Sequence, residues 1–152
     1  MTQKLPEPML RAFTEAEKAA ERGEVPVGAV ITDKLGNILA VAGNRTLADH
    51  DPTAHAEMLA IREVAAKLGS ERLIDCDLYV TLEPCAMCAG AMVHARVKRL
   101  VFAATDPRAG AAGSIFNVVR HDALNHRLHC DSGVLGEECS ALLRGFFLAR
   151  RA

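Results

Sequence analysis

Two cysteines that stand two residues apart directly after a proline constrain this chain more than any other feature. Cys85 and Cys88 follow Pro84, and a strand-like run at residues 78–82 comes just before them. Proline suits the first position of a helix, so we expect a strand that passes into a helix with both thiols about one turn apart on one face. The free amide groups at a helix N-terminus stabilise thiolates. The sequence therefore predicts two potential metal ligands where a strand meets a helix.

Predicted strands and helices alternate along the rest of the chain, which is typical of an α/β layered sheet. Apolar periodicity and runs of β-branched residues define these elements, and turn residues or glycines separate them. In chain order we expect a helix at 8–22, a hairpin of strands at 25–32 and 37–43, a helix that ends at Gly69, a strand at 99–103, a glycine-containing loop at 106–114 and an amphipathic helix at 134–151.

Size and composition fit one globular domain over residues 1–152. Half of the residues are apolar and 24% are charged, which is enough to bury a core and argues against a disordered chain. The net charge is −1, so any nucleic acid has to be held by a local patch. The longest apolar run, at residues 85–93, falls far short of the roughly 20 residues that cross a bilayer, and no apolar leader follows Lys4. We therefore expect a cytoplasmic protein with no membrane partner.

His55 is the candidate third ligand for a metal held by the cysteine pair. Asp51 or Thr53 is expected to cap the helix that ends at Gly69, which would place His55 in its first turn. Catalytic zinc sites take three protein ligands and keep an open position for water, whereas structural sites take four protein ligands. We therefore predict one zinc ion per chain, bound by His55, Cys85 and Cys88.

Two other interpretations of the cysteine pair are a redox dithiol and half of a structural zinc site. A structural site would require a second close pair of ligands, and Cys130 and Cys139 are poorly spaced for that. We expect these two cysteines and Cys76 to be small buried hydrophobic residues. The histidine in register with the pair favours the catalytic site.

The run His55-Ala56-Glu57, followed later by Pro84-Cys85-Ala86-Met87-Cys88, matches the H-x-E…P-C-x-x-C signature of zinc-dependent nucleobase and nucleoside deaminases. In that chemistry zinc lowers the pKa of its water, and a carboxylate that is not a ligand carries a proton from the water to the ring nitrogen and then to the departing ammonia. Glu57 is predicted to be that carboxylate.

Beyond this motif, five stretches of the chain match one known family. They are Val25-Pro26-Val27-Gly28-Ala29-Val30, Gly43-Asn44-Arg45, Asp51-Pro52-Thr53-Ala54-His55-Ala56-Glu57, Thr81-Leu82-Glu83-Pro84 through Met92, and Gly110-Ala111-Ala112-Gly113-Ser114. With them the chain resembles the bacterial tRNA-specific adenosine deaminases over about residues 6 to 151. The resemblance implies a cytidine-deaminase-like fold, which is a three-layer α/β/α arrangement with a central mixed five-stranded sheet. It also implies a homodimer and the hydrolytic deamination of adenosine to inosine at the wobble position of a tRNA anticodon.

The resemblance further implies roles for residues outside the zinc motif. Asn44 should hydrogen-bond the target nucleoside, and Val27 should pack on its base. Backbone groups at Ala56 and at Pro84-Cys85 should face the reacting edge and the bound water. The residues expected to contact the anticodon stem-loop farther out are Asp106, Asn125, Phe147, Arg150 and Arg151.

A basic patch and a stripe of small residues complete the expectations. The candidate phosphate contacts are Arg96, Lys98, Arg99, Arg127, Arg150 and Arg151, with Phe147 available to stack on an unpaired base. The small residues that would allow a second copy to approach the cysteine-bearing helix are Ala86, Ala89, Gly90 and Ala91.

Two alternative functions remain open at this point. A deaminase of free cytosine or guanine would share the whole zinc motif, but it would not require the 110–114 loop, the Asn125-His126-Arg127 stretch or the aromatic and basic end of the last helix. A non-catalytic binding module stabilised by zinc would not need Glu57.

Overall fold

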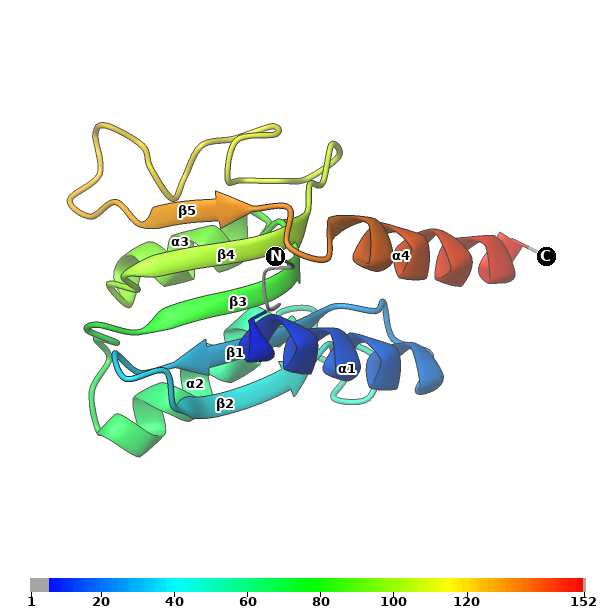
Figure 1. Cartoon of the computed structure of the whole chain (residues 1–152), viewed down its shortest axis with the longest axis horizontal. Coiled ribbons are helices and arrows are strands. Elements are labelled where there is room, and N and C mark those ends of the chain that lie inside the picture. Colours follow the sequence, from blue (N-terminus) through cyan, green and yellow to red (C-terminus); the bar gives the residue numbers. More distant parts are fainter. Residues whose placement is uncertain (1–5, 152) are drawn as a thin grey trace, which may run out of the picture.

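A five-stranded mixed sheet forms the centre of the molecule in the computed structural model, which describes residues 6–151 (Figure 1). The strands are β1 (Gly28–Thr32), β2 (Ile38–Gly43), β3 (Asp77–Leu82), β4 (Arg99–Ala104) and β5 (His129–Ser132), in the spatial order β2-β1-β3-β4-β5. β1 pairs antiparallel with β2 and with β3, whereas β3, β4 and β5 run parallel. The predicted mixed sheet and its hairpin are confirmed.

Two pairs of helices cover the two faces of this sheet. α1 (Glu7–Glu21) and the start of α4 (Gly136–Arg151) lie on one face, and α2 (Ala56–Leu68) and α3 (Ala86–His94) lie on the other, while the rest of α4 runs out beyond the ends of the strands (Figure 1). This confirms the three-layer α/β/α arrangement. Within the described part of the chain, no helix has the length and apolar character needed to span a bilayer.

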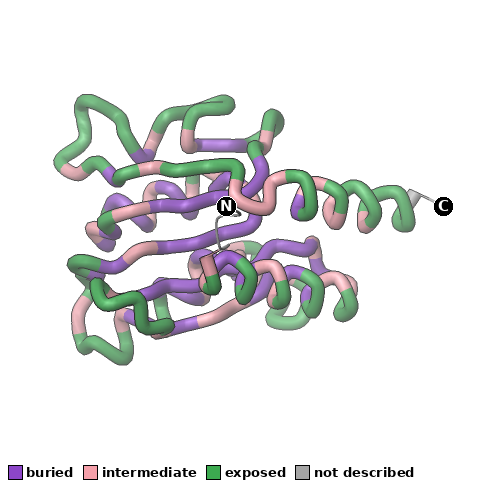
Figure 2. Tube along the Cα trace, viewed as in Figure 1, coloured by how far each residue is buried: buried purple, intermediate pink, exposed green. Residues whose placement is uncertain are grey.

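The strands at the centre of the sheet are buried on both faces (Figure 2). Alternate side chains face the α2 and α3 layer, such as Ile31 and Val80, while Val30 and Tyr79 face the α1 and α4 layer. Gly28 lets α1 approach β1 closely, because a side chain there would overlap the carbonyl oxygen of Ala12. α1 is thereby packed directly against β1, the strand beside β3.

The helix that carries His55 begins later than the pattern predicts. α2 starts at Ala56, so His55 is its N-cap residue and does not lie in its first turn. The expected cap, Asp51, instead accepts hydrogen bonds from the N–H (2.8 Å) and hydroxyl (2.7 Å) of Thr53, which closes a separate turn before the helix.

The helix that carries Cys88 also begins later than predicted. α3 starts at Ala86, with extended backbone at its N-cap residue Cys85, whereas the pattern placed Pro84 at the first helical position. The two cysteines therefore sit at the cap and in the first turn.

Other boundaries differ by a few residues. β1 starts at Gly28 because the preceding segment turns, with the N–H of Val27 donated to the carbonyl of Val25 (2.8 Å). α4 starts at Gly136, two residues after the predicted position. β5 matched no pattern in the sequence, because its side chains are mostly exposed and do not alternate. The cysteines expected to be buried are so at positions 76 and 139, while Cys130 is half-buried.

Candidate active site

The N-termini of α2 and α3 bring the three predicted metal ligands together. His55 caps α2, Cys85 caps α3, and Cys88 lies in the first turn of α3. Their ligand atoms all lie within 4.8 Å of one another, and no other such group of His, Cys, Asp and Glu side chains occurs among residues 6–151. Cys88 is buried, while His55 and Cys85 are half-buried, so the cluster is accessible from one side.

The spacing of these atoms fits zinc. His55 Nδ1 lies 3.7 Å from Cys85 Sγ and 3.5 Å from Cys88 Sγ. Tetrahedral zinc with Zn–S near 2.3 Å and Zn–N near 2.0 Å holds a sulfur and a nitrogen about 3.6 Å apart. One imidazole and two thiols are a donor set that zinc prefers, and three protein ligands leave a fourth position for water.

The thiols of Cys85 and Cys88 have very different pKa values. Hydrogen bonds from Cys88 and from His55 lower the pKa of Cys85 to about 3. The pKa of Cys88 is raised, because its thiol is bonded to Cys85 and is buried. Cys85 is thus poised as a thiolate, and binding a metal would release the proton of Cys88.

Glu57 lies beside this cluster without belonging to it. It follows His55 by two residues in the first turn of α2, and its side chain is only 3% exposed. Burial raises the pKa of Glu57 to about 7, although the nearby imidazole of His55 acts in the opposite direction. A carboxylate with a pKa near neutrality can both accept a proton and return it.

Asn44 connects the end of β2 to the start of α2. The side-chain oxygen of Asn44 accepts the backbone N–H of Ala56 (2.8 Å), and the backbone N–H of Asn44 is donated to the carbonyl of Val27 (3.1 Å). The structure therefore links three of the predicted substrate residues, Val27, Asn44 and Ala56, through hydrogen bonds at the start of α2. The N–H of Ala56 is occupied by this bond, and the side-chain nitrogen of Asn44 is the donor that remains for a ligand. The roles of all three toward substrate stay predictions.

Comparison with known proteins agrees with this geometry. The family model described as the cytidine and deoxycytidylate deaminase zinc-binding region matches residues 2–104. A tRNA-specific adenosine deaminase from Haemophilus influenzae is 50% identical over 146 residues, which cover 95% of this chain and 84% of that protein. The chain belongs to the tRNA-specific adenosine deaminase family. The zinc cofactor predicted from the motif is accordingly part of this deaminase.

Solved structures show how widely this deaminase fold is shared. One from a study of A-to-I editing by tRNA:A34 deaminases at the wobble position has a TM-score of 0.86 and 44% identity, and the match covers 90% of this chain and 98% of that one. A guanine deaminase from Nitrosomonas europaea has a TM-score of 0.80 and 26% identity, with 96% and 86% covered. The fold alone therefore does not distinguish a tRNA substrate from a free base.

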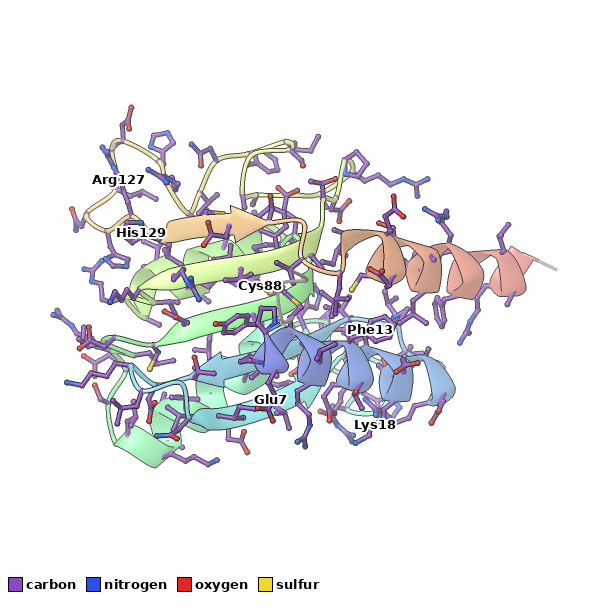
Figure 3. The ribbon with its side chains drawn as sticks, in the orientation of Figure 1. Glu7, Phe13, Lys18, Cys88, Arg127 and His129 are labelled. Atoms are coloured by element: carbon purple, nitrogen blue, oxygen red, sulfur yellow. The ribbon has the colours of Figure 1, made fainter. Side chains whose placement is uncertain are left out.

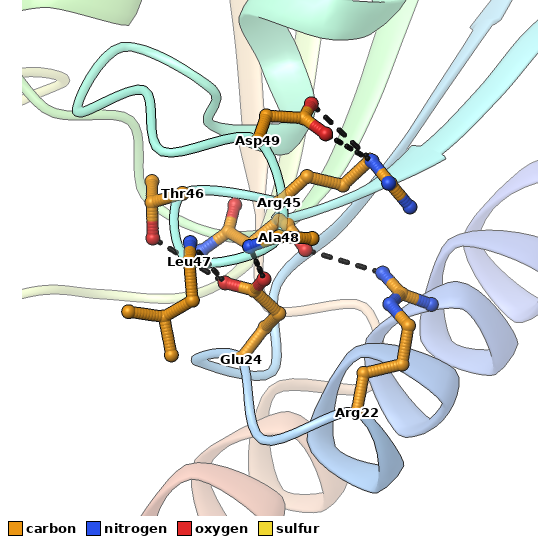
Figure 4. Close-up of polar contacts among 8 residues, drawn as sticks. Arg22, Glu24, Arg45, Thr46, Leu47, Ala48 and Asp49 are labelled. Carbon is orange, nitrogen blue, oxygen red and sulfur yellow. Dashed lines mark hydrogen bonds and ion pairs between the residues drawn. The ribbon is translucent and has the colours of Figure 1, made fainter.

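A buried carboxylate that the sequence analysis missed supports the Asn44 segment of this deaminase. Glu24 is 2% exposed, and it accepts the N–H of Leu47 (3.1 Å) and of Ala48 (2.9 Å) (Figure 4). Arg22 donates to the carbonyl of Asn44 (3.1 Å). Burial alone would raise the pKa of Glu24, but these hydrogen bonds outweigh it and hold the pKa below its usual value. A charged residue that precedes the buried Val-Pro-Val run was the available signal.

A second missed carboxylate lies directly before the cysteine motif. Glu83 accepts the backbone N–H groups of Asp106, Ala112 and Ser114. Burial opposes ionisation, yet the hydrogen bonds from Ser114 and from the backbone keep the pKa of Glu83 lowered. The available signal was a charged residue directly after the strand-like run at residues 78–82, where it needs donors to be buried.

The structure brings two of the expected RNA contacts into one groove. Asp106 and Phe147 both line a groove of about 700 Å³ between the loop after β4 and the side of α4. Arg144, which the sequence analysis did not assign, lines it as well. Phe147 is 45% exposed and packs edge-to-face on Phe146.

Arg150 is held within the chain. It donates to the carbonyl of Gly23 (2.8 Å), and its guanidinium group lies 4.5 Å from the centre of the Phe146 ring. The end of α4 is thereby fastened to the turn after α1, whatever further contact Arg150 makes. The side chain of Arg151 lies outside the described residues.

Asn125 and four of the expected basic contacts lie away from the metal ligands. The ring of His126, next to Asn125, is hydrogen-bonded to the carbonyl of Val97 (2.6 Å), beyond the C-terminal end of α3. Figure 3 shows Arg127 at the end of the sheet remote from Cys88. The others at this end are Arg96, Lys98 and Arg99.

Arg99 is also occupied by other side chains. It forms ion pairs with Asp77 (3.3 Å) and Asp131 (3.6 Å) and donates to the hydroxyl of Tyr79 (2.9 Å). The expected basic patch is therefore divided between two separate places in the folded molecule, and Arg99 is a poor candidate for a phosphate contact.

Proposed function

We propose that this chain converts adenosine to inosine at the wobble position of a tRNA anticodon, acting as one zinc-dependent deaminase domain over residues 1–152. The observation that carries the reaction type is a cluster of only three protein ligands with a buried, non-ligating carboxylate beside it. The substrate follows from the identity with a tRNA-specific adenosine deaminase over 95% of the chain.

The residues of the site divide the reaction between them. His55, Cys85 and Cys88 would hold zinc, which when bound would supply a Lewis acid that lowers the pKa of a water. Glu57 would accept one proton from water and deliver it to the ring nitrogen, and would then carry the second proton, from the added hydroxyl, to the amine that leaves as ammonia, so that the oxygen of water replaces the exocyclic nitrogen. Asn44 holds the nucleoside through its side-chain nitrogen.

The groove beside the 105–108 loop is proposed to receive the nucleotides next to the wobble base. Asp106 faces a ribose there, Phe147 stacks on an unpaired base, and Arg144 adds a positive charge on the same wall. Val27 packs on the inserted base, while Ala56 and Pro84 line its reacting edge. Arg150 and Arg151 contact phosphate at the end of α4. Acting on tRNA places the protein in the cytoplasm.

The homodimer is proposed to form through the outer face of α3. Gly90 and Ala91 are half-buried in the single chain, and a side chain on Gly90 would meet nothing within 4 Å. Ala89, expected on the same stripe, lies in the core instead. Because Asn125 and the metal ligands lie near opposite ends of α3, an antiparallel pairing would bring Asn125 toward the second active site. Sedimentation that shows only a 16.3 kDa species at working concentration would contradict the dimer.

A substrate panel tests the proposed function. Zinc-loaded protein would be incubated with an anticodon stem-loop that carries adenosine at the wobble position, and separately with free adenosine, cytidine, cytosine and guanine. We expect inosine in the stem-loop and little product from the free compounds. Efficient turnover of guanine or cytosine with an unchanged stem-loop would favour a free-base deaminase, and zinc without ammonia release on any substrate would favour a binding module.

A further inference from the structure

We propose that Glu83 is a positioning residue for the substrate, which acts by holding Asp106 and the rest of the 106–114 loop against the segment that supplies Cys85. The proposal rests on the proposed function, because it takes Asp106 as a contact to the RNA. Glu83 itself is neither one of the three grouped metal ligands nor one of the residues that line the groove.

Four donors converge on the Glu83 carboxylate, which is 2% exposed. Oε1 accepts the N–H of Asp106 (3.0 Å) and the hydroxyl of Ser114. Oε2 accepts the N–H of Ala112 (2.9 Å) and of Ser114 (3.1 Å). Both ends of the loop are therefore tied to one buried charge, and hydrogen bonds to a charged group are stronger than neutral ones.

The bond to Asp106 orients its side chain. Asp106 Oδ1 accepts the N–H groups of Arg108 (3.0 Å) and Ala109 (3.2 Å), so the carboxylate closes the turn that it begins. Glu83 fixes the backbone at the first residue of this turn. Losing that bond would free the turn as a unit and move the Asp106 carboxylate along the groove.

The loop is also shaped to fit around Glu83. A side chain on Gly110 would overlap the Glu83 carboxylate and the carbonyl of Asp106. The next N–H, of Ala111, is donated to the carbonyl of Pro84 (2.8 Å), directly before Cys85. The loop is thus hydrogen-bonded to the same short segment that contains the metal ligand Cys85.

Replacing Glu83 by glutamine should remove the hydrogen bond to Asp106 without removing those to Ala112 and Ser114. An amide nitrogen in the place of Oε2 would face two N–H donors, so it should take the place of Oε1. There the Ser114 hydroxyl can turn and accept a hydrogen bond, but the N–H of Asp106 loses its acceptor. Glu83→Gln therefore releases Asp106 and keeps the bonds to Ala112 and Ser114.

The first experiment measures zinc content, kcat and KM for the stem-loop. We expect Glu83→Gln to raise KM by about tenfold to a hundredfold while zinc content and kcat stay near those of the unmodified protein. A general loss of structure would lower zinc content and kcat and leave KM unchanged, and that result would overturn the proposal.

A double-mutant cycle with Asp106→Ala tests whether Glu83 acts through Asp106. We expect Asp106→Ala to raise KM and Glu83→Gln to add little in that background. Additive effects on KM would contradict the proposal.

Gly110→Ala offers a second route to the same displacement if Glu83→Gln folds poorly. Its methyl group should push the carboxylate away and raise KM as Glu83→Gln does, whereas the matched Gly145→Ala, which meets nothing within 4 Å on α4, should not. An unchanged KM in Gly110→Ala would overturn the proposal.

Amide hydrogen exchange tests, without any substrate, whether Glu83 holds the loop in place. In zinc-loaded protein, Glu83→Gln should speed exchange at the Asp106 amide and leave the Ala112 amide protected. Unchanged exchange at Asp106 would overturn the positioning role. If exchange changes as expected but the unmodified protein leaves the stem-loop untouched, the proposed function fails and the role of Glu83 in holding the loop stands.

Discussion

Glu57 at the start of α2 and Glu83 directly after β3 are two glutamates with almost equally little exposed surface, 3% and 2%. Burial raises the pKa of Glu57 to about 7. Burial also opposes ionisation of Glu83, but hydrogen bonds from Ser114 and from backbone N–H groups keep its pKa lowered. The exposed surface alone therefore does not explain the difference between their pKa values.

The surroundings of each carboxylate explain it, because Glu57 is the more deeply desolvated of the two and Glu83 accepts four hydrogen bonds. A carboxylate that accepts several N–H groups is a fixed negative charge, which suits it to hold a loop and makes it a poor proton carrier. A desolvated carboxylate next to metal ligands changes its protonation state near neutral pH, which suits proton transfer. Glu24, with its own N–H donors from the 46–48 turn, belongs with Glu83.

The largest effect should come from removing a metal ligand. Cys85→Ala should lose both zinc and activity, because two remaining protein ligands do not make a closed zinc site. The loop around Glu83 should keep its amide protection, since its four bonds do not involve the metal. Metal analysis and hydrogen exchange on the same sample check this, and full zinc occupancy in Cys85→Ala would contradict the ligand assignment.

Glu57→Gln should have the next largest effect. The variant should bind zinc fully and lose more activity than the roughly 10²- to 10⁴-fold usually due to one acid or base, because Glu57 acts in more than one proton transfer. Single-turnover kinetics on the stem-loop measure the loss. If Glu57→Gln turned over the stem-loop at the rate of the unmodified protein, Glu57 would not be the proton carrier.

These assignments also show which parts of the site could be predicted from sequence. His55, Glu57 and the two cysteines were predictable because each group lies within one short motif. Glu83 and Glu24 were not, because their donors come from residues more than 20 positions away, which only the folded chain brings close.

The fold shows the same division between local and distant effects. The hairpin and the helices followed from local patterns, while the start of α2 depends on a distant partner, since Asn44 accepts the first helical N–H. β5 has no apolar alternation to reveal it. Arg99 looked available in the sequence, and its partners Asp77 and Asp131 lie on two neighbouring strands.

Glu24→Gln should have a moderate effect that depends on pH. The lowered pKa means that the folded state binds the proton less readily than the unfolded state, so the stabilisation by Glu24 is present above the unfolded pKa of about 4.3 and is lost as pH falls through the folded pKa. At neutral pH the free energy of unfolding should be about 1–3 kcal/mol lower for Glu24→Gln than for the unmodified protein, and this difference should become smaller in acid. Urea unfolding at several pH values checks this, and a gap that widens in acid would contradict it.

Arg150→Ala should have the smallest effect. It removes a bond to Gly23 and a cation–π contact at an exposed helix end, which together contribute about 1 kcal/mol. Zinc content should not change, while stem-loop binding should weaken and its salt dependence should fall by about one counterion. Arg150→Lys is the matched control for charge. If stem-loop binding by Arg150→Ala and by the unmodified protein had the same salt dependence, Arg150 would not contact phosphate and would only fasten α4 to the turn after α1.

The most direct test of the whole account is to follow the oxygen of water into the wobble nucleotide. The zinc-loaded protein would act on the anticodon stem-loop in water enriched in oxygen-18, with Glu57→Gln in parallel, and the nucleosides would be analysed by mass spectrometry. The account predicts inosine at the wobble position with one oxygen-18 atom, formed by the unmodified protein and almost absent with Glu57→Gln. Unlabelled inosine, or adenosine that stays unchanged while free guanine is deaminated, would contradict it.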